Sequence, residues 1–151
     1  AAFNFGAGKL QRVKQSLFTA ILLGTLWTTV VSLLLVFKPQ WLLQLFTDDA
    51  LLIETASDIS SIVFLGFITT AAGMMCSTIF QAMGKALPAM LLESARTYIL
   101  LVPMILGLPM LLGIQGIWWA FPITDVIGVT VTLLFTGYYF KNRLSNQSAE
   151  K

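Results

Sequence analysis

The chain has 151 residues, of which 57% are hydrophobic and 11% are charged, and its formal net charge is +2. An ordinary soluble domain is about 25% charged, and the uncharged runs here reach the roughly 20 residues that cross a lipid bilayer. The composition therefore excludes a typical soluble domain and indicates an integral membrane protein. With no histidine and one cysteine, an intrachain disulfide and a Cys/His metal site are also excluded.

Residues 1–15 precede the first apolar run and are Gly-rich and basic. Gly6 and Gly8 are typical of the end of a helix, and the residues from Lys9 onward suit a helical turn at the membrane interface. No charged stretch precedes an apolar core in the way a signal peptide requires. We expect residues 1–15 to be a cytoplasmic connecting segment and the chain to be part of a longer protein.

The first span is predicted at residues 16–37, which carry no charge. Residues 38–58 then form the one substantial outer loop, which is net acidic. Apolar residues recur in it at i, i+3 and i+4 from Trp41 to Phe46, so a short helix lying on the membrane surface is expected. Thr47 or Asp48 is predicted to cap the next helix, with Asp49 in its first turn.

The second span is predicted at residues 59–83. Small residues such as Gly66 and Gly73 favour close contact with another helix. Soft, aromatic and polar side chains follow the same span. They either pack in the core or line a cavity for flat, lipophilic ligands. The candidate cavity-lining residues are Phe64, Phe67, Thr70, Met74, Met75 and Gln81.

The third and fourth spans are predicted at residues 88–112 and 117–140. Pro103 is expected to kink the third span in its outer half, because proline removes a helical hydrogen bond. Only residues 113–116 separate the two spans, so they must be antiparallel neighbours. Residues 141–151 are polar and are expected to form a disordered cytoplasmic tail.

Basic residues fix the expected orientation. With four spans, Lys38 is the one basic residue that falls on the acidic side. The positive-inside rule therefore places both ends of the chain in the cytoplasm. A Gly-Lys step occurs at residues 8–9 and again at 84–85; it is either a generic helix stop with a headgroup anchor or the trace of a repeated helix pair. The basic residues that fall on the opposite, cytoplasmic side include Lys9, Arg12, Lys14, Lys85, Lys141 and Arg143.

Three charged residues, Glu93, Arg96 and Asp125, fall within the third and fourth spans. Arg96 lies about 16 Å beyond Lys85, and Asp125 about 16 Å from the outer turn, at 1.5 Å per residue. In a hydrocarbon layer of about 30 Å these depths nearly coincide. Arg96 and Asp125 are therefore predicted to pair near the middle of the membrane, with Glu93 one helical turn from Arg96.

This cluster has two interpretations. An Arg96–Asp125 bridge would lock two helices together, with Glu93 near the headgroups or acting as a second partner. Alternatively, because Arg96 is always charged, one of Glu93 and Asp125 is protonated at rest and carries a coupling proton.

Four stretches together resemble the last third of the multidrug and toxic compound extrusion (MATE) transporters. They are FNFGAGKLQRVK, LFTDD, FQAMGKALPAMLL and GIWWAFPITD, and they occur in the family's order and spacing over nearly the whole chain. The resemblance implies an all-α protein of twelve helices in two six-helix lobes. This chain would be helices nine to twelve, part of the C-terminal lobe, and its partners would be the remaining eight helices and the lipid bilayer.

The resemblance further implies an efflux antiporter in the plasma membrane that exchanges Na⁺ or H⁺ for lipophilic organic cations. It implies no cofactor beyond that coupling ion, no enzymatic activity and no nucleic-acid partner. Arg96 and Asp125 match residue types common in the family, whereas Glu93 stands where a small polar residue is more usual. The second span has only Asp58, at its outer end, so the coupling site is not assigned. Four helices alone are expected to be inactive.

Three alternatives remain. A flippase for lipid-linked saccharide precursors, from the same superfamily, would have a wide, basic cavity. A free-standing four-helix transporter acting as a homodimer would carry an essential acid in its first span, and residues 16–37 have none. A membrane-embedded enzyme is the weakest alternative, because the usual nucleophile and metal-binding sets are missing.

Overall fold

The computed structural model describes residues 1–149, with side chains through residue 142. Four helical stretches in it are long and apolar enough to cross a membrane. They are Leu10–Phe37, Ala50–Ala82, Ala86–Leu112 and Gln115–Asn142. The predicted fold of four antiparallel membrane helices is confirmed, and the protein is a multi-pass membrane protein.

Two of the spans begin earlier than their apolar runs do. Helix α2 begins six residues before the predicted span at residue 16, and α4 begins nine residues before residue 59, because polar side chains alone do not stop a helix. For the same reason α8 continues into the tail expected to be disordered; residues 150–151 of that tail lie outside the described residues. The elements are α1 (Ala2–Gly6), α2 (Leu10–Phe37), α3 (Pro39–Leu43), α4 (Ala50–Ala82), α5 (Ala86–Ser94), η1 (Ala95–Leu101), α6 (Val102–Gly107), α7 (Pro109–Leu112) and α8 (Gln115–Ala149).

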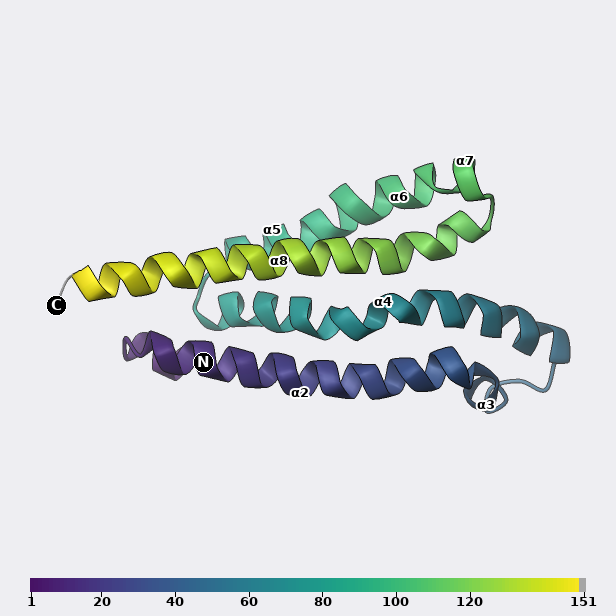
Figure 1. The fold of residues 1–151 in the computed structure, drawn as a ribbon, viewed down its shortest axis with the longest axis horizontal. Helices are drawn as coiled ribbons and strands as arrows, with labels where there is room; N and C mark the ends of the chain where they lie inside the picture. The colour runs from purple at the N-terminus through teal and green to yellow at the C-terminus, as the bar shows by residue number, and fades with distance from the viewer. Residues whose placement is uncertain (150–151) are drawn as a thin grey trace.

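Helix α4 is the centre of the bundle. It packs against α2 on one side and α8 on the other, and the third span, from α5 to α7, packs against α4 and α8 (Figure 1). A buried apolar cluster joins all four spans near one end. The start of α2, the turn between α4 and α5 and the C-terminal part of α8 lie at this end (Figure 1). We call it the basic end, because these segments carry Lys9, Arg12, Lys14, Lys85 and Lys141. The apolar cluster consists of Val13, Leu17, Cys76, Ile79, Phe80, Met83, Ala89 and Phe140.

The two Gly-Lys steps share one backbone geometry. Gly8 and Gly84 have φ angles of 69° and 72°, in the left-handed region that glycine adopts without strain. Lys9 N–H donates to the Asn4 carbonyl and Lys85 N–H to the Phe80 carbonyl, both over five residues. This is the Schellman arrangement that closes a helix, so a helix stop suffices to explain the recurrence.

The outer loop differs from the sequence prediction in its cap. Asp49, not Thr47 or Asp48, caps α4, since its carboxylate accepts hydrogen bonds from the backbone N–H groups of Leu51 and Leu52. Thr47 instead accepts a hydrogen bond from the Asp49 N–H. Several adjacent residues here have capping side chains, and the backbone turn selects Asp49.

The third span changes its helical winding before Pro103. Residues Ala95–Leu101 form a π-helix, in which Val102 N–H donates to the Thr97 carbonyl five residues back. The wider turn accommodates the proline ring downstream. The α-helix breaks at Leu108, just before Pro109. The distortion expected at Pro103 is therefore spread along the span, and it begins next to Arg96.

Candidate functional site

An ion pair joins the third span to α8. The guanidinium of Arg96, on η1, contacts the carboxylate of Asp125, on α8. This is the contact that the depth estimate predicted. The side chains are 34% and 14% exposed, respectively, so the pair lies largely inside the bundle. Among the residues whose side chains are described, it is the one salt bridge.

Small residues on the neighbouring helices make room for this pair. A Cβ placed on Gly66 would lie 2.9 Å from Asp125 Oδ2, and one placed on Gly128 would lie 2.8 Å from Arg96 Cγ. Thr70, on α4, donates a long 3.5 Å hydrogen bond to Asp125 Oδ2. Three spans thus converge on one carboxylate, and α4 approaches α8 closely because Gly66 lacks a side chain.

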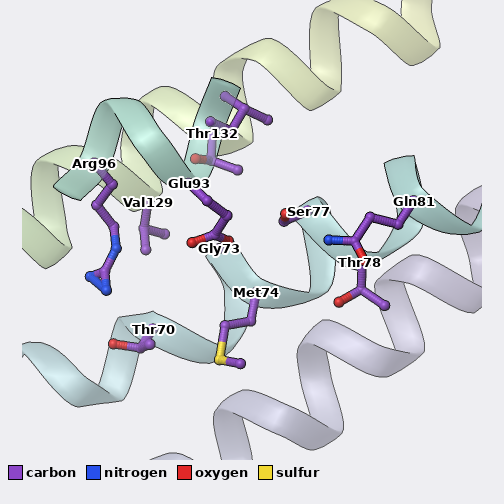
Figure 2. A pocket seen from close by; sticks show the side chains of 12 residues that line it. Thr70, Gly73, Met74, Ser77, Thr78, Gln81, Glu93, Arg96, Val129 and Thr132 are labelled. Carbon is purple, nitrogen blue, oxygen red and sulfur yellow. The ribbon is translucent and has the colours of Figure 1, made fainter. Parts of the chain in front are cut away.

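An open cavity of about 280 Å³ lies beside the ion pair, toward the basic end. One face of α4 forms one wall, and Glu93 and Arg96 face it from the third span (Figure 2). Hydroxyl, amide and thioether groups share the lining with apolar side chains. The lining residues are Thr70, Gly73, Met74, Ser77, Thr78, Gln81, Leu92, Glu93, Arg96, Gly128, Val129 and Thr132.

Glu93 lines the cavity without a charged partner among the described side chains. Although it is three residues from Arg96, the two form no salt bridge, because the Arg96 guanidinium is directed to Asp125 on α8. Two charged side chains therefore line the cavity. The positive charge of Arg96 is paired with Asp125, whereas the carboxylate of Glu93 is uncompensated, since it forms no salt bridge among the described side chains. The local electrostatic character of the cavity is negative.

Three of the six residues predicted from the sequence to line a cavity line this one in the structure. Thr70, Met74 and Gln81 do line this one. Phe64 and Phe67 do not, since they lie farther along α4 toward the outer end, where their rings make an edge-to-face contact with centroids 5.5 Å apart. Met75 packs against the buried apolar cluster instead. One helical step of about 100° separates it from Met74 and turns it toward α2.

Helical periodicity could have found the α4 wall more fully. Residues 70, 73, 74, 77, 78 and 81 recur at steps of three and four, which place them on one face. The contribution of α8, including Gly128 and Thr132, has no such signal, because hydropathy does not tell which helices are neighbours. Within the described part of the chain, no three His, Cys, Asp or Glu side chains gather in a way that could hold a metal ion.

Comparisons with known proteins point to one family. The MatE family model matches residues 1–109. A protein of Shewanella oneidensis named FAD transporter is 25% identical over 126 residues, which cover 83% of this chain and 28% of that protein. The solved structure of the MATE multidrug transporter DinF-BH in complex with R6G matches with a TM-score of 0.79 and 30% identity, over 88% of this chain and 30% of that one. The chain thus spans less than a third of the length of either protein.

Proposed function

Because the chain belongs to the MatE family, we propose that it supplies the last four helices of a secondary active efflux transporter. The complete protein exchanges Na⁺ or H⁺ for lipophilic organic cations by alternating access in the plasma membrane, with the basic end facing the cytoplasm. The remaining eight helices complete the path, so the four helices alone are inactive. The observation that carries this proposal is the uncompensated carboxylate in the open cavity.

The cavity chemistry suits a flat organic cation. Glu93 supplies the opposite charge to that of the cation, and the attraction between the two is electrostatic. Met74 supplies a polarisable, adaptable surface. The hydroxyl group of Thr78, which is exposed, adds hydrogen-bonding capacity to the cavity wall. Such a site favours flat, positively charged ligands and does not require one particular molecular outline.

The ion pair has a positional role in this proposal. Arg96 and Asp125 hold η1 against α8 and so fix one wall of the cavity. If a proton is the coupling ion, Glu93 is the better carrier of the two carboxylates. Protonating Asp125 would leave Arg96 charged and unpaired inside the membrane, at a cost of at least about 2.5–3.5 kcal/mol. Protonating Glu93 removes no salt bridge among the described side chains.

A second candidate is export of an anionic nucleotide-containing compound, since one relative is named FAD transporter. A flippase for lipid-linked saccharides would likewise handle an anion, and a free-standing homodimer remains a further alternative. For the two anion carriers, the cavity should hold an uncompensated positive charge. Here the Arg96 guanidinium is taken by Asp125, which favours the cation.

The test is cation-gradient-driven transport by the full-length protein in proteoliposomes, with ethidium as the probe. Glu93→Gln keeps the size and polarity of the side chain and removes its charge. We expect the apparent KM for ethidium to rise about tenfold or more, since one charged contact contributes roughly 1.5–3 kcal/mol. Glu54→Gln is the matched control, because Glu54 is exposed on α4 and lies outside this cavity. Equal ethidium transport by Glu93→Gln and the wild type would overturn the assignment of Glu93. FAD transport without ethidium transport would favour the second candidate.

A further inference from the structure

A second, mostly apolar groove lies on the other side of the bundle, between α2 and α8. Its volume is about 540 Å³, and it does not share a lining residue with the cavity that holds Glu93. Helix α4 separates α2 from α8, and Cys76 of α4 lines the groove between them. The lining consists of Lys14, Leu17, Phe18, Ile21, Cys76, Leu133, Thr136, Gly137, Phe140 and Lys141.

Two lysines stand at the basic end of this groove. Lys14 lies near the start of α2 and Lys141 near the end of the membrane-crossing part of α8, and both are exposed. Neither forms a salt bridge among the described side chains. Lys85, at the same end, differs from them because its Nζ lies 5.6 Å from the centre of the Tyr139 ring. The groove therefore has two positive charges that form no salt bridge with any side chain that the structure describes.

The length and polarity of the groove match one end of a lipid molecule. From Lys14 to Ile21, and from Lys141 back to Leu133, the walls extend about 10–12 Å along the helices. That is roughly a third of the hydrocarbon thickness. The one hydroxyl in the lining, on Thr136, donates to the Thr132 carbonyl. Gly137 leaves open space where a side chain would otherwise stand. The wall thus offers apolar contact along its length and charge at one end.

We propose that this groove binds an anionic phospholipid of the cytoplasmic leaflet. The phosphate lies between Lys14 and Lys141, and an acyl chain follows the apolar wall past Leu17 and Leu133. Basic pockets between membrane helices on the cytoplasmic side bind anionic headgroups in this way. The charge pattern decides the class of lipid, because a zwitterionic headgroup would leave the two lysines without net compensation.

The experiment uses the full-length protein in nanodiscs of phosphatidylcholine. Each sample contains a trace of phosphatidylglycerol or phosphatidylcholine that carries a photoactivatable diazirine on its acyl chain. Adducts are mapped by mass spectrometry. We expect the phosphatidylglycerol probe to label groove residues such as Phe18 and Leu133 at least about tenfold more than the phosphatidylcholine probe. Each lysine near an anionic lipid contributes roughly a fivefold preference, and high salt should reduce the preference in the unmodified protein.

A matched pair of double variants separates the groove from the general charge of the basic end. Lys14→Ala/Lys141→Ala should abolish the preference for phosphatidylglycerol in the groove. Lys9→Ala/Arg12→Ala removes the same charge from the same end and should retain it. Arg12 lies on another face of α2, where it lines a different hollow with Thr19 and Leu23.

Three results of the labelling experiment would overturn the proposal. They are equal labelling by the two probes, a preference that survives the loss of both lysines, and a preference that salt does not change. A groove filled by another helix of the protein or by a second copy would also contradict it. In that case neither probe would label the groove.

Discussion

Substitution of Gly66 by alanine tests how closely α4 and α8 must approach each other. A Cβ on Gly66 would lie 2.5 Å from Pro122 Cα, whereas ordinary van der Waals contact begins at 3.4 Å. The nearest atom belongs to the backbone of α8, so no side-chain rotation relieves the overlap. The two helices must separate by roughly 0.9 Å, and the movement strains the contacts of Asp125 with Thr70 and Arg96.

The expected cost follows from two opposing effects. Overpacking of a close contact costs about 1–3 kcal/mol. Alanine in place of glycine within a helix returns up to about 1 kcal/mol. We therefore expect Gly66→Ala to lower the thermal melting temperature of the full-length protein in detergent. We also expect it to weaken transport, because the movement shifts α8, with Asp125 and the cavity residues it carries, away from the α4 wall of the cavity.

Alanine substitutions at two other glycines serve as controls for Gly66→Ala. Gly107→Ala meets no atom within 4 Å, so it should leave the melting temperature unchanged or raise it. Gly128→Ala meets the flexible Arg96 side chain at 2.8 Å and should fall between the two. The reasoning is refuted if Gly66→Ala melts at the same temperature as Gly107→Ala, since the close approach of α4 to α8 would then carry no energetic consequence.

Three further predictions concern single sites. Asp125→Leu should destabilise the protein in detergent by about 3–5 kcal/mol, whereas Arg96→Met/Asp125→Leu should recover most of that loss, because no unpaired charge remains; a double variant no more stable than Asp125→Leu would argue against the pair. Asp49→Ala should cost about 1 kcal/mol through loss of its cap on α4, measured by thermal melting, and an unchanged melt would contradict the capping role. Phe80→Ala should cost about 3–5 kcal/mol, because its fully buried ring contacts those of Phe135 and Tyr139; a cost below 1 kcal/mol would show that this cluster is loosely packed.

The sequence was sufficient for the number of spans and for the central ion pair. Hydropathy identifies a span because a helix that crosses the hydrocarbon core of the bilayer must be mostly apolar over a fixed length. The same fixed thickness converts residue count into depth, and this depth places Arg96 and Asp125 at one level of the membrane. The position of a span and the depth of a residue in it depend only on one helix and the lipid around it, so both can be predicted from the local sequence.

The cavity required information of another kind. The α4 wall follows from helical periodicity, but the packing of α4 between α2 and α8 does not. Helix α4 is apolar on nearly all sides, so hydropathy does not tell which face meets which neighbour. For that reason the sequence predicts Phe64, Phe67 and Met75 together with Met74, although only Met74 of these four lines the cavity beside the ion pair. The π-helix at Arg96 likewise depends on how the third span packs, and a proline alone does not specify it.

The central claim is that the cargo passes through the cavity between α4 and the third span. Thr78→Cys, in a Cys76→Ala background, places a reactive thiol on an exposed cavity position, and Thr97→Cys places one on an exposed position of η1 outside it. The rate of maleimide labelling is measured in the full-length protein at increasing ethidium concentration. The account predicts that ethidium slows labelling at Thr78→Cys several-fold, with half-maximal protection near the KM for transport, and leaves Thr97→Cys unaffected. Normal ethidium transport with equal labelling rates at Thr78→Cys, with and without ethidium, would contradict it.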